Sequence, residues 1–147
     1  MKFPSLRALF GGAGSYKTPL PEADAAHALG ALMVRAAKSD KTYLFEEIAQ
    51  IDRIIARTQG LNPVAAAKMR AECELLEREM PKTEDIVALL RDAIGLDERE
   101  AALLALWQVV FADGISHLEE DQLLHEIEAY LGISPERALE LQTKAAV

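Results

Sequence analysis

The chain has 147 residues, of which half are hydrophobic and 27% are charged, and this composition is typical of one folded domain rather than of a disordered chain. Sixteen basic and twenty-four acidic residues give a net charge of -8, which disfavours binding to nucleic-acid phosphates or to an anionic membrane surface. The single cysteine, Cys73, excludes an internal disulfide and a multi-cysteine metal site. We therefore expect a cytoplasmic domain in a reducing compartment, with no nucleic-acid partner and no membrane span.

Residues 1–20 are expected to form a flexible N-terminal tail ahead of a helical domain at residues 21–147. Pro4 and Arg7 interrupt the apolar stretch that a signal peptide needs. Residues 6–10 could form one amphipathic turn that docks on the body of the protein or on a partner, and disorder is the alternative. The longest apolar run, residues 101–112, is shorter than the roughly 20 residues that a membrane span requires.

From Pro21 onward the apolar residues recur at helical spacing, and strand-like alternation is absent. This pattern predicts an all-α fold, a compact bundle of about seven helices with short connections. The expected helices cover residues 22–39, 43–59, 63–79, a short stretch from residue 83 that Gly95 ends, and residues 97–113, 116–131 and 135–147.

Several of the expected helix ends carry residues that favour capping. Gly60 and Gly132 are expected to end two helices. The pairs Asn62-Pro63 and Ser134-Pro135 each supply an N-cap followed by a proline at the first helical position. Asp97 and Glu100 have the spacing of a capping box, which predicts a helix start at Asp97.

Two segments of the chain resemble one another. Residues 37–47 (AKSDKTYLFEE) align with residues 110–120 (VFADGISHLEE). This likeness predicts an internal duplication of a helical hairpin. Packing explains the shared apolar positions, but it does not require the repeated acids. In the alignment Asp40 falls on Asp113, Glu46 on Glu119, and Glu47 on Glu120.

The repeated acids are candidates for a metal site. Asp40 and Asp113 are each placed at the C-terminal end of an apolar helix, where the helix dipole disfavours a negative charge by roughly 0.3–1 kcal/mol. If the two hairpins pack with a pseudo-twofold axis, four carboxylates meet, and they need a cation to stay ionised together. Oxygen ligands favour Ca²⁺, Mg²⁺ or Mn²⁺. The expected ligands are Asp40, Glu47, Asp113 and Glu120, with Glu46 and Glu119 as secondary candidates.

An alternative explanation needs no metal. In that interpretation the acids cap helix ends and form ion pairs with basic neighbours such as Arg35, Lys38 and Lys41.

The turn Ala112-Asp113-Gly114, followed by Glu119 and Glu120, resembles the tellurite-resistance TerB family, as does its degenerate copy at residues 39–47. The resemblance spans about residues 23–146. It implies a compact all-α fold, an acidic metal-binding centre, an association with tellurite resistance and stress responses, and no enzymatic reaction. On this chain the family's acidic positions are Asp40, Glu47, Asp113 and Glu120. The sequence departs from the pattern at Lys41, which stands in place of a glycine.

No arrangement of a nucleophile and a base is visible, so we expect no enzyme. Acidic neighbours of Cys73 are expected to raise its thiol pKa and make it less reactive. His27 lies on an apolar helix and is expected to be a satisfied core or interface residue. The leading hypothesis is weak binding of a divalent cation. The alternative is an adaptor whose acidic face or apolar groove docks a protein partner without metal, and homodimerisation through the apolar hairpins is left open.

Overall fold

The computed structural model describes residues 20–21, 23–114 and 118–147. Within these ranges the protein contains seven α-helices and one short 3₁₀ helix, and no strand. The helices are α2 (Ala25–Lys38), α3 (Phe45–Gln59), α4 (Pro63–Glu79), α5 (Thr83–Ala93), α6 (Leu96–Val110), η1 (Phe111–Asp113), α7 (Leu118–Leu131) and α8 (Pro135–Ala145). The predicted all-α bundle is confirmed. The predicted tail lies, apart from Leu20, outside the described residues.

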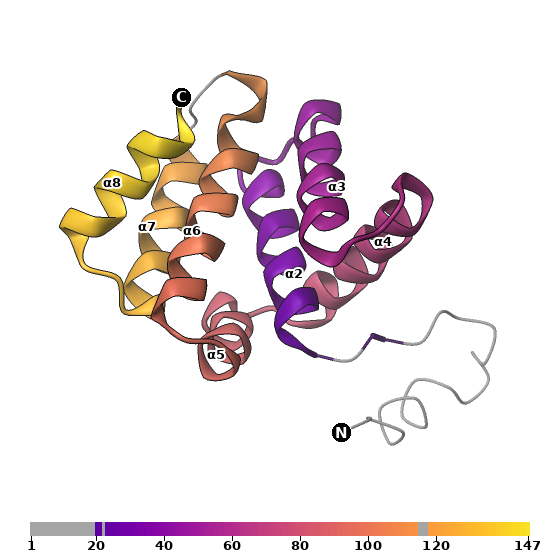
Figure 1. Cartoon of the computed structure of the whole chain (residues 1–147), viewed down its shortest axis with the longest axis horizontal. Coiled ribbons are helices and arrows are strands. Elements are labelled where there is room, and N and C mark those ends of the chain that lie inside the picture. Colours follow the sequence, from indigo (N-terminus) through magenta and orange to yellow (C-terminus); the bar gives the residue numbers. More distant parts are fainter. Residues whose placement is uncertain (1–19, 22, 115–117) are drawn as a thin grey trace.

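Helix α2 is the centre of the bundle. Figure 1 shows it between α3 and α4 on one side and α5, α6 and α7 on the other, and it contacts all five. Eight of its fourteen residues are buried, because it is apolar on nearly every face. Gly30 allows α4 to approach closely, since a Cβ atom at this position would collide with the Cys73 Sγ.

Helix α6 organises the second half of the bundle. It packs against α2 and α3 on one side and against α7 and α8 on the other. Its largest side chain, Trp107, is fully buried and stacks on Phe111, with the ring centroids 5.3 Å apart. The 3₁₀ turn η1 then extends the end of α6 to contact α3. This packing brings the ends of α2 and α6 and the starts of α3 and α7 to one region.

Most of the predicted caps are present. The Asn62 side chain accepts a hydrogen bond of 2.8 Å from the backbone N–H of Ala65, and α4 begins at Pro63. The Ser134 hydroxyl accepts one of 3.2 Å from the backbone N–H of Arg137, at the start of α8. Gly60 and Gly132 adopt left-handed conformations, with φ of 65° and 74°, at the ends of α3 and α7.

Several predicted helix starts were wrong by one to three residues, and α3 begins at Phe45 rather than at residue 43. Helix α2 begins at Ala25 rather than at residue 22, because the Asp24 carboxylate accepts a hydrogen bond of 2.8 Å from the backbone N–H of His27. The predicted capping box of Asp97 and Glu100 does not form.

The start of α6 uses different residues. Gly95 is the N-cap of α6, and the preceding helix α5 already stops at Ala93. The backbone N–H of Gly95 lies 3.5 Å from the Glu98 carboxylate. Glu100 pairs instead with Arg137 of α8, at 3.0 Å. The apolar helix itself ends at Val110, and the chain tightens into η1 before Gly114.

None of the helices in the described ranges is both long and apolar enough to cross a membrane.

Candidate functional site

The two aspartates of the predicted site lie in turns closed by the same kind of backbone hydrogen bond, from the N–H of Lys41 to the carbonyl of Lys38 and from the N–H of Gly114 to the carbonyl of Phe111. Asp40 follows the end of α2, and its Oδ1 accepts hydrogen bonds from the Thr42 N–H (3.0 Å) and hydroxyl (2.6 Å). Asp113 is the last residue of η1. The residue after each, Lys41 and Gly114, has a positive φ, 68° and 76° respectively.

Glu47 lies in the first turn of α3 and is fully buried, with 0% of its surface exposed. Its Oε1 accepts a hydrogen bond of 3.1 Å from the backbone N–H of Leu44, which fixes the start of the helix. Its Oε2 is buried without a hydrogen-bond partner in the described structure. Helix capping therefore explains the position of Oε1, but it leaves the burial of Oε2 unexplained.

Glu120 is the second fully buried carboxylate, in the first turn of α7. Neither of its oxygens has a hydrogen-bond donor among the residues that the structure places. Burial of a carboxylate without a donor is costly, so that either a proton or a cation must compensate the charge.

The Glu47 and Glu120 carboxyl groups interact, and each changes the pKa of the other. Burial is the main cause that raises the pKa of Glu120, and the Glu47 carboxylate adds to it. Burial also raises the pKa of Glu47, although hydrogen bonds from Glu120 and from the Leu44 backbone oppose this. When both groups are ionised neither can donate, so the contact becomes a hydrogen bond only when the pair holds a proton.

The aspartates act on this pair through their charges. The Coulomb fields of Asp40 and Asp113 each raise the pKa of both Glu47 and Glu120. The structure therefore brings the four predicted acids into one electrostatic unit, with two glutamates inside and two aspartates, partly buried, around them. Glu46 and Glu119 are exposed and do not belong to the buried pair.

The described side chains do not form a ready-made metal cage. In residues 20–21, 23–114 and 118–147, no three His, Cys, Asp or Glu side chains are placed so that they could hold one ion. What the fold supplies is a pair of buried carboxylates with unsatisfied oxygens. The assignment of all four acids as metal ligands stays a prediction.

Two of the basic neighbours that were expected to neutralise these acids are engaged with another acid. Arg35 and Lys38 form ion pairs of 3.0 and 2.9 Å with Glu77 of α4. Burial alone would raise the pKa of Glu77, but the two cations outweigh it and lower the pKa below its usual value. Arg35 also donates to the backbone carbonyls of Glu77 and Met80, so it ties α2 to the end of α4. Nothing in the sequence spacing singled out Glu77.

The other candidate reactive groups have structural roles. Cys73 is fully buried, and burial, with the nearby acids, raises the pKa of its thiol to about 12, in the direction that the sequence predicted. The His27 ring contacts Asp24 at 2.9 Å and Glu72 at 3.0 Å, so it is satisfied as expected. It joins the start of α2 to α4.

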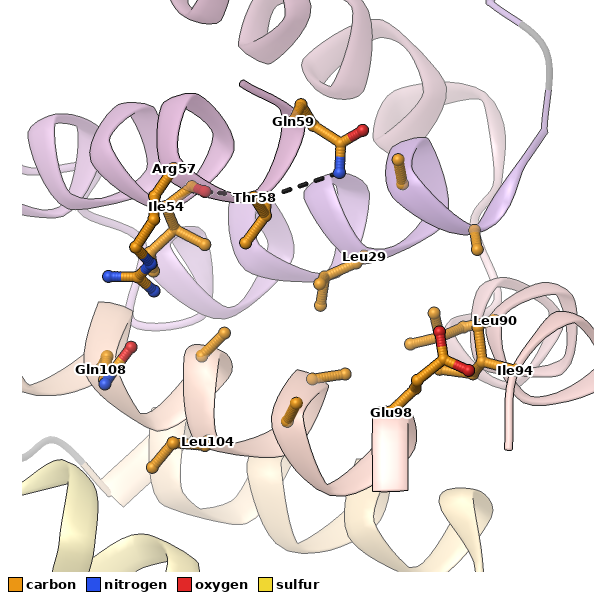
Figure 2. A pocket seen from close by; sticks show the side chains of 15 residues that line it. Leu29, Ile54, Arg57, Thr58, Gln59, Leu90, Ile94, Glu98, Leu104 and Gln108 are labelled. Carbon is orange, nitrogen blue, oxygen red and sulfur yellow. Dashed lines mark hydrogen bonds between the residues drawn. The ribbon is translucent and has the colours of Figure 1, made fainter. Parts of the chain in front are cut away.

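The structure also contains an apolar groove that no motif predicted. It has a volume of about 450 Å³ and lies among α2, α3, α5 and α6. Figure 2 shows Leu29 of α2 and Leu104 of α6 on opposite walls, with Arg57 and Gln108 toward one end and Glu98 toward the other. The groove is a second site, separate from the carboxylate pair.

Fold and site together define a class: a compact all-α domain with a buried carboxylate pair between two helix starts. The family model described as tellurite resistance protein TerB matches residues 26–142, so the chain belongs to the TerB family. The resemblance inferred from the acidic turn is thereby confirmed. Comparison with curated proteins gives no match, and comparison with solved structures gives none either.

Proposed function

We propose that this TerB-family domain serves tellurite resistance or a related stress response in the cytoplasm by binding a divalent cation weakly, without catalysing a reaction. The observation that carries the proposal is the pair Glu47 and Glu120. Both are fully buried, and three of their four carboxylate oxygens have no hydrogen-bond donor in the described structure.

The charge balance of the pair favours a cation. Two adjacent buried carboxylates cannot both ionise unless positive charge compensates them. A proton shared by Glu47 and Glu120 does this in the metal-free protein, and a divalent cation would replace that proton. Because Asp40 and Asp113 already act on both glutamates through their charges, the same field attracts a cation, and they are the further ligands that we propose.

The chemistry of the donors selects the kind of ion. All four candidate ligands are carboxylates, and hard oxygen donors favour Ca²⁺, Mg²⁺ or Mn²⁺ over thiolate-loving metals. The cationic Lys41 lies next to Asp40, where the second turn has the uncharged Gly114. This charge opposes a cation at the first half of the site, which is consistent with weak binding. The matching hydrogen bond and the positive φ in the two turns support an internal duplication, which we propose as the origin of the paired acids.

Calorimetric titration of the full chain with Ca²⁺, Mg²⁺ and Mn²⁺ tests the proposal. Glu47→Gln with Glu120→Gln is expected to abolish binding, and Asp40→Asn with Asp113→Asn to weaken it. The matched control is Glu46→Gln with Glu119→Gln, which makes the same two substitutions at exposed neighbours in the same helical turns. Absence of binding in the unaltered protein, or equal loss in the control, contradicts the proposal.

An exposed surface favours the second candidate function, an adaptor that needs no metal. Phe45 and Leu118 are 78% and 67% exposed at the starts of α3 and α7, beside the exposed acids Glu46 and Glu119. Such a mixture of apolar and acidic side chains suits a partner with apolar and basic residues. The adaptor function is favoured if one partner binds in the presence of a chelator. That binding should be lost in Phe45→Ser with Leu118→Ser and kept in Glu47→Gln with Glu120→Gln.

A further inference from the structure

Small side chains contribute much of the lining of the apolar groove. Ala25 and Ala26 of α2 and Ala101, Ala102 and Ala105 of α6 all line it, and a short alanine side chain fills little of the space between the helices. Leu29 and Leu104 are only partly buried and extend into this space from the two walls. The result is an apolar surface that nothing in the described part of the chain covers.

The ends of the groove differ in charge. Arg57 of α3 lies at one end and Glu98 of α6 at the other (Figure 2). Both side chains are exposed. The end with Glu98 also holds Leu90 of α5 and Ile94, which directly follows that helix. An occupant therefore needs an apolar face for the centre and a basic group for the acidic end.

We propose that residues 6–10 of this chain occupy the groove, with Leu6, Leu9 and Phe10 against the alanines and Arg7 toward Glu98. In a helical turn these three apolar residues are spaced i, i+3 and i+4, which places them on one face. Arg7 then falls outside that face, where it is able to contact the rim.

The connecting chain is long enough for this docking. The groove is lined by Ala25, the first residue of α2, so the segment before α2 joins the body at the groove itself. Residues 11–24 connect Phe10 to Ala25 and span at most ~3.3–3.6 Å each when extended. Helix α6, which forms one wall, has 15 residues at ~1.5 Å per residue. The connection therefore reaches any point of the groove, and docking within one chain has the advantage of a high effective concentration.

The charge distribution of the chain favours the same occupant. Residues 1–20 contain Lys2, Arg7 and Lys17 and no acidic residue, whereas all twenty-four acidic residues follow them. The first twenty residues are thus attracted to the body as a whole. Glu98 places one of these negative charges directly at the groove.

Paramagnetic NMR on the full chain tests the proposal. Cys73 is buried, so Ala8→Cys provides one accessible thiol for a nitroxide label, beside the apolar face rather than on it. We expect a loss of methyl signal intensity at Leu29 and Leu104 and none at Leu139, which is exposed on α8. Leu6→Ser with Phe10→Ser in the labelled protein is expected to restore the signals of Leu29 and Leu104.

A second variant changes the groove and leaves residues 1–20 intact. Ala101 is exposed at the edge of the groove, so Ala101→Phe fills it without overpacking the core, and helical circular dichroism checks that the fold is kept. This variant is also expected to restore the methyl signals of Leu29 and Leu104. Full intensity at both residues in the labelled but otherwise unaltered protein overturns the proposal. A second sample mixes nitroxide-labelled copies with isotope-enriched copies that carry no nitroxide. A loss of the Leu29 and Leu104 signals in that mixture also overturns the proposal, because the occupant of the groove then comes from a second molecule.

Discussion

Lys41 and Gly114 take the same left-handed backbone conformation, with φ of 68° and 76°, each directly after an aspartate of the acidic unit. Glycine adopts this conformation freely, whereas an L-residue with a Cβ atom loses roughly 1–2 kcal/mol in it. The turn after α2 therefore keeps a backbone shape that its own sequence disfavours. A lysine there combines that cost with a positive charge beside Asp40.

Lys41→Gly is accordingly expected to raise the free energy of unfolding by about 1 kcal/mol, measured by urea denaturation. Lys41→Gln separates the two effects, because it removes the charge and retains the Cβ atom. Gly114→Ala is the reciprocal variant: a Cβ atom there meets nothing within 4 Å, so its expected loss of stability comes from the backbone alone. Equal stability of Lys41→Gly and the unaltered protein would show that the turn is not strained.

Local chemistry explains why much of the fold was predictable. The Asn62-Pro63 and Ser134-Pro135 starts and the Gly60 and Gly132 ends depend on a few neighbouring residues, and all are present in the structure. The Asp97–Glu100 box failed because Gly95 and Glu98 offered a competing cap two residues earlier. Sequence spacing alone does not decide between two such registers.

The site was predictable only in part, because it depends on contacts between distant helices. Repetition pointed to Glu47 and Glu120, but not to their meeting in a fully buried contact while Glu46 and Glu119 face outward. The groove had no sequence signal, since its alanines look like ordinary core residues until α2 and α6 are placed face to face. Nor did any spacing indicate that Glu77 would hold both Arg35 and Lys38.

Glu120→Gln is expected to stabilise the metal-free protein at neutral pH by on the order of 1 kcal/mol. The introduced amide stays neutral and donates a hydrogen bond to the Glu47 carboxylate, so folding no longer requires a proton on the pair. Thermal unfolding in the presence of a chelator measures the effect, and Glu119→Gln is the exposed control. A destabilised Glu120→Gln protein would mean that the acid itself makes a favourable contact in the metal-free fold.

Gly30→Ala is expected to destabilise the protein by about 1–3 kcal/mol, because the new methyl group collides with the buried Cys73 Sγ where α2 meets α4. Cys73→Ala removes that sulfur, so the double variant is expected to lose less stability than the two single losses added together. A double-mutant cycle in urea measures this coupling. Simple additivity would show that the close approach of the two helices is not what requires a glycine at position 30.

The pH dependence of stability is expected to contain a contribution from His27. Burial alone lowers the pKa of this imidazole, but hydrogen bonds and charge interactions with Glu72 and Asp24 outweigh it, and the net effect raises the pKa above 6.5. The folded protein then holds the proton more tightly than the unfolded chain. The resulting stabilisation is complete below pH 6.5 and is lost as the pH rises through the raised pKa.

Urea denaturation at a series of pH values, compared between the unaltered protein and His27→Gln, isolates this contribution. The difference in free energy of unfolding between the two proteins is expected to be largest at mildly acidic pH and to shrink toward alkaline pH. Glu72→Gln retains the imidazole but removes its partner at 3.0 Å, so it is expected to reduce the same dependence. Because Asp24 also caps α2 through the His27 backbone N–H, the cap remains in both variants and the comparison reports the imidazole alone. A difference that stays constant across the series would show that the proton on His27 does not help to join α2 to α4.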